Sequence, residues 1–141
     1  MKSKLIILIL ILGVSGAIIG YKMWNKPHQD IAASDSTASL TASDLLKAYQ
    51  SDETTANAKY LNKIIAVSGS IEEVRKEADQ ITIHLGTQDA MATVICNLDP
   101  FSSHAGTEFE TGQNVTMKGV CSGMLTDVVL DRCVVVNQPS N

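Results

Sequence analysis

The chain has 141 residues, enough for one domain of ordinary size and an appendage. Beyond residue 26 it holds seven basic and 15 acidic side chains, a net charge of −8. Such an acidic part repels phosphate backbones, whereas nucleic-acid-binding proteins draw much of their affinity from Lys and Arg. The composition therefore argues against nucleic acid as a partner.

The N-terminal stretch predicts a single transmembrane helix that attaches the chain to a membrane through residues 5–24. About 20 apolar residues span a hydrocarbon core, and Tyr21 and Trp24 fall where aromatic rings favour the headgroup layer. The alternative is a signal peptide cut after Ala17, where small residues suit a signal peptidase. We expect residues 1–26 to be a membrane anchor (or signal), with the following domain on the exported, periplasmic side of the cell membrane.

A polar linker and two helices come next. Residues 27–40 are small and polar, which predicts a flexible linker. Thr41 followed by Asp44 is typical of a helix start, and a helical apolar stripe follows at Leu45, Leu46 and Tyr49. Residues 52–61 predict a second short helix. We expect these helices to cover the end of a β-structure.

From residue 64 onward the apolar residues recur with a period of two. Strands are predicted at 64–71, 80–86 and 91–98, and two more in the hairpin of residues 112–136. Five short strands at this spacing favour a small closed barrel or a sandwich. The predicted fold is mainly β (α+β): a five-stranded barrel of the oligonucleotide/oligosaccharide-binding (OB) type over residues 41–137, with a helical N-terminal cap.

Three cysteines raise the question of a disulfide. Cys121 and Cys133 lie on either side of the hairpin turn, and an exported compartment permits a bond between them. Strand alternation allows the two side chains to share a face only if a bulge lies near Asp131. Cys96 with Cys121 is the alternative pair, and three buried, reduced thiols are the third possibility.

The sequence contains no recognisable catalytic or metal-binding motif. It lacks a P-loop, a G-x-S-x-G motif, a C-x-x-C pair and the ligand spacings of zinc sites. We therefore expect no enzymatic activity and no cofactor, and a binding role toward a protein or an envelope component. The expected ligand face lies across the second and third strands, around Thr82, His84, Met91 and Thr93. The alternatives are a binder of single-stranded nucleic acid or oligosaccharide, and a thiol redox or metal-binding protein.

Several segments between Leu40 and Val136 stand out together: 56–63 leading into 65–69, 94–96, 119–123, 127–130 and Cys133. In their order and spacing they resemble a family of bacterial OB-fold proteins, called tRNA_anti-like or OB-fold putative lipoproteins. The resemblance implies a five-stranded barrel on the exported side of a bacterial membrane, and it does not imply binding of tRNA. Many members carry a lipoprotein signal, whereas this chain has no Cys near its apolar N-terminal block.

Overall fold

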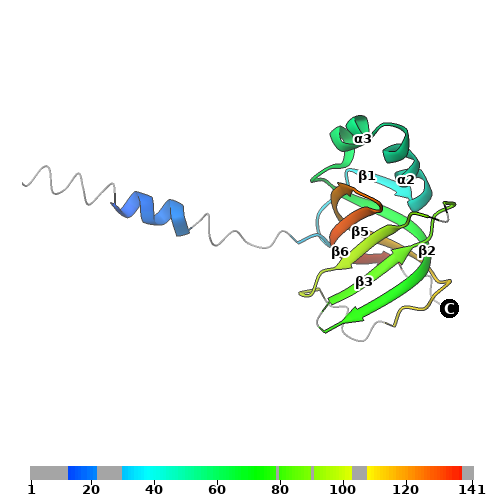
Figure 1. Cartoon of the computed structure of the whole chain (residues 1–141). Coiled ribbons are helices and arrows are strands. Elements are labelled where there is room, and N and C mark those ends of the chain that lie inside the picture. Colours follow the sequence, from blue (N-terminus) through cyan, green and yellow to red (C-terminus); the bar gives the residue numbers. More distant parts are fainter. Residues whose placement is uncertain (1–12, 22–29, 79, 90, 103–107, 138–141) are drawn as a thin grey trace, which may run out of the picture.

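A computed structural model describes residues 13–21, 30–78, 80–89, 91–102 and 108–137. Residues 13–21 are helical. The following elements are β1 (Ala38–Thr41), α2 (Ala42–Ser51), α3 (Glu53–Tyr60), β2 (Ile64–Glu77), β3 (Gln80–Leu85), β4 (Val94–Leu98), β5 (Asn114–Met124) and β6 (Val128–Asn137) (Figure 1). This order of short helices followed by strands agrees with the predicted α+β class.

Five of the strands close into a barrel. The sheet order is β1-β2-β3-β4-β6-β5, and a further pairing of β2 with β5 completes the ring. The 14-residue strand β2 makes this closure possible because its first half pairs with β5 and its second half pairs with β3. A register shift between Ile71 and Glu73 marks the change of partner. The predicted five-stranded OB-like barrel is confirmed.

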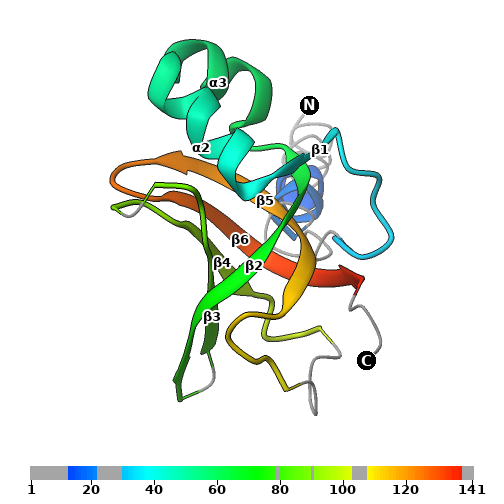
Figure 2. The same ribbon diagram turned by 90° about the vertical axis from the view of Figure 1, so that its right-hand side faces the viewer.

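The two helices cover one end of the barrel, as predicted (Figure 2). The Thr41 hydroxyl accepts a hydrogen bond from the Asp44 amide at 3.1 Å, which caps the first turn of α2. Asp52 caps α3 in the same way through the Thr55 amide. The apolar stripe of α2 enters the core, where Leu45, Leu46 and Tyr49 are at most 2% exposed. Burial of this stripe explains why so short a helix is stable.

The segment expected to be a flexible linker is ordered against the barrel where the structure describes it, from residue 30 onward. Ile31 is 1% exposed and packs with Ile64 and Val134 on the outside of the barrel. The Lys118 ammonium donates to two backbone carbonyls of this segment, at 2.7 and 2.9 Å. Residues 38–41 then form β1, parallel to β2. Residues 30–40 therefore contribute to the packing of the domain.

The predicted anchor lies mostly outside the described residues. Residues 5–12 and 22–24 are not described, and residues 13–21 form a helix whose side chains are exposed. No helix within the described parts of the chain has both the length and the apolar character needed to span a membrane. The transmembrane helix, and the domain boundaries at residues 26 and 40, stay predictions.

Candidate binding face

Strands β3 and β4 carry polar side chains where the sequence analysis expected a ligand face. On β3 the side chains of Ile83 and Leu85 are buried, while Thr82 and His84 are half-buried on the outer side. The register places Thr82 opposite Asn97 of β4. The strict alternation of a β-strand separates the two sets of side chains, so polar groups line the outer surface of the barrel here.

One row of hydrogen bonds crosses this face from β3 to β5. The Thr82 hydroxyl donates to Asn97 Oδ1 at 3.1 Å, and Asn97 Nδ2 donates to Asp131 Oδ1 at 2.8 Å. The other carboxylate oxygen of Asp131 accepts from the Ser122 hydroxyl. Four strands are thus joined by one chain of side-chain contacts, which fixes the orientation of each polar group.

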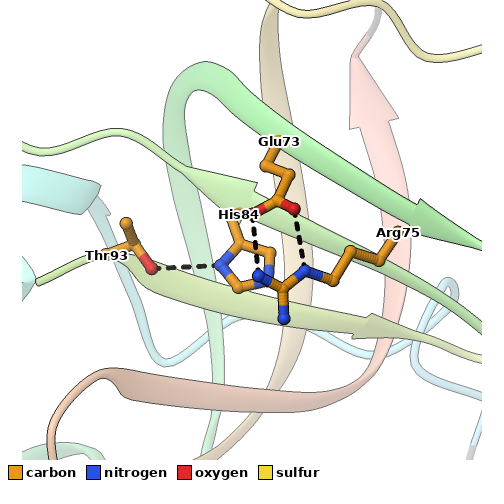
Figure 3. Close-up of polar contacts among 4 residues, drawn as sticks. All are labelled: Glu73, Arg75, His84 and Thr93. Atoms are coloured by element: carbon orange, nitrogen blue, oxygen red, sulfur yellow. Dashed lines mark hydrogen bonds and ion pairs between the residues drawn. The ribbon is translucent and has the colours of Figure 1, made fainter.

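A second row lies beside the first, at the ends of the strands. Asp127 Oδ1 accepts from both the amide and the hydroxyl of Thr93, at 2.7 and 3.0 Å. His84 Nδ1 lies 3.3 Å from the same hydroxyl oxygen (Figure 3). Because a hydroxyl has one proton and Asp127 accepts it, the imidazole must be the donor in this contact. The arrangement therefore selects the tautomer of His84 that carries a proton on Nδ1.

An ion pair on β2 borders the two rows. Arg75 donates to both carboxylate oxygens of Glu73, at 2.8 and 3.0 Å, next to His84 (Figure 3). The hydrogen bond from Arg75 lowers the pKa of Glu73, and the same contact raises the pKa of Arg75. Because the one cation of this pair is already matched by a carboxylate, the pair adds no net charge to the face.

The predicted residues divide into three that come together and one that does not. Thr82, His84 and Thr93 lie on the same face, and Thr93 immediately precedes β4, which begins at Val94 rather than at residue 91 as predicted. Met91 is 87% exposed in the β3–β4 loop, with its amide bonded to Asp89. The Asp89 contact holds this residue in a turn, so its side chain is not part of the sheet.

Sequence reasoning missed Asn97, Asp127 and Asp131. Asn97 has the same strand parity as Thr93, so alternation alone would have placed it on this face. The two aspartates reach the face because β4 and β6 run parallel side by side. Nothing local in the sequence specifies that pairing.

All three cysteines are buried and carry free thiols. The bulge expected near Asp131 is present: Arg132 has φ = 52°, and the β5–β6 register shifts between Lys118 and Val120. The bulge places Cys133 on the inner side of the barrel, where its side chain is fully buried. Burial and a hydrogen bond with Cys96 raise the pKa of Cys133.

Cys121 has a different neighbour. It stands opposite Leu130 in the register, and its sulfur lies 3.3 Å from the Tyr49 hydroxyl of α2. The structure therefore forms neither the predicted Cys121–Cys133 bond nor the alternative Cys96–Cys121 bond. Within the described residues, no three His, Cys, Asp or Glu side chains gather as metal ligands would.

The closed barrel, in which the long strand β2 pairs with both β3 and β5, is that of an OB-type protein. The tRNA_anti-like family matches residues 1–135, so the chain belongs to that family. No curated protein matches it. A solved lipoprotein of Klebsiella pneumoniae subsp. pneumoniae MGH 78578, provisionally described as nucleic acid-binding, has a similar fold. The two chains are 20% identical with a TM-score of 0.54, over 69% of this chain and 91% of the other.

Proposed function

We propose that the protein is a non-enzymatic binding module, tethered to the cell membrane with its barrel on the exported side. Its ligand is a protein or another component of the cell envelope, which binds the outer face of β3 and β4. The observation that carries this proposal is the pair of hydrogen-bonded rows on that face, because they hold polar groups in fixed directions at the surface. Preorganised polar groups reduce the entropic cost of binding.

The order of groups in the second row supports binding rather than catalysis. A nucleophilic hydroxyl needs a histidine that can accept its proton and a carboxylate that orients the histidine. Here the hydroxyl of Thr93 lies between Asp127 and His84, and its proton points to the carboxylate. Such an arrangement holds the imidazole in place and leaves it no proton to remove from the hydroxyl.

Single-stranded nucleic acid is the second candidate ligand, since the similar Klebsiella lipoprotein is provisionally described as a nucleic acid-binding protein. Charge argues against it here. Arg75 is already paired with Glu73, and Asp127 and Asp131 add negative charge to the same face. Proteins that bind single-stranded nucleic acid combine a basic groove with exposed aromatic rings. This face has neither feature among its described residues.

A binding comparison tests the proposal. Full-length protein in nanodiscs would be immobilised and exposed to solubilised envelope fractions, and separately to 15-nucleotide DNA and RNA at low salt. We expect retention of an envelope component, weakened about 10-fold by Thr82→Ala, because loss of the first donor of the row leaves Asn97 Oδ1 without the hydrogen bond from Thr82. Thr54→Ala on the exposed side of α3 is the matched control.

Two results would count against the proposal. Equal retention by wild type and Thr82→Ala would remove this face as the binding site. Salt-dependent binding of the oligonucleotides that is lost in Arg75→Ala would favour the second candidate. Membrane tethering is tested separately, by fractionation of cells and by protease access to a C-terminal tag after the outer membrane is permeabilised.

A further inference from the structure

A second surface site lies on the other side of β2, where the N-terminal end of α2 meets the start of β5. It is an open cavity of about 660 Å³. None of the described residues that line it is charged. Six of them have uncharged polar side chains: Thr41, Ser43, Ser68, Ser70, Asn114 and Thr116. The remaining lining is small, with Ala42, Val115 and two glycines. The polar groups that this cavity offers are therefore hydroxyl and amide groups, set among small apolar groups.

Four of these side chains make no hydrogen bond to the described part of the protein. Ser68 faces Thr116, and Ser70 faces Asn114, across the antiparallel β2–β5 pair. In contrast, the polar side chains on β3 and β4 are tied to one another in rows. Thr41 and Ser43 are also engaged, as the helix cap and as an acceptor for the Gln88 amide. As far as the described residues go, the two facing pairs thus keep their capacity to donate and accept.

We propose that this cavity binds a neutral saccharide of one or two rings. Hydroxyl and amide side chains both donate and accept, as do the hydroxyls of a sugar, so facing pairs of such side chains match adjacent hydroxyls on one ring. A lining without charge disfavours phosphates and carboxylates. No large apolar side chain is present among the described lining residues, so the cavity offers no deep pocket for an acyl chain. The volume lies within the roughly 300–1,000 Å³ of ordinary ligand sites.

The affinity should be modest, because no aromatic ring among the described lining residues can stack on a sugar. We expect dissociation constants on the order of millimolar. The site is also independent of the face proposed above, since the two share no residue. A protein that fails to retain any envelope component through Thr82 can still bind a sugar here, and the reverse also holds.

The test is a titration of the full-length, ¹⁵N-labelled protein in nanodiscs, followed by amide chemical shifts. The probes are N,N′-diacetylchitobiose and maltose, with triglycine and inorganic phosphate for comparison. We expect saturable shifts of the amides of residues 68–70 and 114–116 with at least one sugar. The double variant Ser68→Ala/Thr116→Val should raise its dissociation constant about 10-fold, through the loss of two neutral hydrogen bonds.

Two matched variants make the result specific. Ser51→Ala/Thr54→Val repeats the same chemical changes at exposed helix positions and should leave the dissociation constant unchanged. Ser70→Ala, at an exposed position, replaces the double variant if that protein does not fold. The proposal is overturned if neither sugar gives saturable shifts at these amides, if the cavity variants bind as wild type does, or if triglycine or phosphate binds there more tightly.

Discussion

Among the described glycines, Gly119 of β5 leaves the least room for a side chain. A Cβ atom added at this position would lie 2.5 Å from Cys133 Sγ and 3.0 Å from the Asp131 carbonyl oxygen. Cys133 is fully buried, and its thiol donates to the Leu130 carbonyl at 3.4 Å. Rotating the thiol away from a new methyl group would break that contact and would push the sulfur into filled space. We therefore predict that Gly119→Ala is strongly destabilising.

The expected cost is about 1–3 kcal/mol, as for other overpacked cores. For a domain of this size, each kcal/mol lowers the melting temperature by roughly 4–8 °C. Urea denaturation followed by circular dichroism measures the free energy of unfolding directly. Gly86→Ala is the control, since its nearest neighbour would be an ordinary contact at 3.5 Å. That variant should stay within about 0.5 kcal/mol of wild type.

A double-mutant cycle decides whether the thiol is the obstacle. In a Cys133→Ala background the 2.5 Å contact no longer exists, and the backbone contact at 3.0 Å remains. Gly119→Ala should then cost at least about 1 kcal/mol less than it does in wild type. An equal cost in both backgrounds would show that the sulfur is not the obstacle, and a cost below about 0.5 kcal/mol in wild type would refute the packing argument altogether.

Three further predictions concern the helical cap, the N-terminal segment and pH. Thr41→Ala should cost about 1 kcal/mol in urea denaturation, because the first turn of α2 loses its cap; an unchanged midpoint would contradict this role. Ile31→Ala should cost at least about 2 kcal/mol if residues 30–34 hold to the barrel as described, and faster amide exchange at Ala32 and Ser34 would accompany it. Burial raises the pKa of both the Cys133 thiol and the Tyr49 hydroxyl, so the folded state keeps protons that the unfolded chain releases above about pH 8.5 and pH 10, respectively. The contribution of these two groups to the free energy of unfolding is therefore fully present below about pH 8.5 and is lost as pH rises further. Equal urea midpoints at pH 7 and pH 10.5 would contradict this.

The parts of the fold that could be predicted from sequence are those with local signals. Thr41 and Asp44 mark the start of α2 because a cap acts within a single turn. The barrel strands are visible because each alternates between a buried and a solvated face. The fold class follows from the spacing of those strands, and a closed barrel is the arrangement that leaves none of the five with an open edge.

The packing of residues 30–41 against the barrel could not be predicted from local signals. Strand β1 has four residues, Ala38–Thr41, whose composition suits a linker as well as a strand. Its pairing partner, Ile65–Ser68, comes some distance later in the chain, so the strand is defined by tertiary contact. One local sign was present. Ile31 is a large apolar residue in a polar stretch, and such a residue is best explained by a surface for it to pack against.

The residues of the candidate site also differ in whether a local sequence pattern could predict them. Alternation on β3 was enough to place Thr82 and His84 together. Asp131 joined them only through the parallel pairing of β4 with β6 and the bulge at Arg132. The same bulge lets Cys133 point into the core. Strand parity could indicate that a bulge was needed, whereas the neighbours of the Cys133 thiol depend on packing across the whole barrel.

The two outer surfaces of the barrel use polar residues in opposite ways, and this difference bears on what each can bind. On β3 and β4 the side chains satisfy one another, so a ligand meets groups whose directions are already set. On β2 and β5 the facing pairs are left to solvent, so a ligand there must replace water with equivalent hydrogen bonds. A preorganised face favours selection of one partner by shape and direction. A solvated, uncharged cavity favours weak binding of a hydroxyl-rich ligand, which is the reason for expecting the two surfaces to serve different ligands.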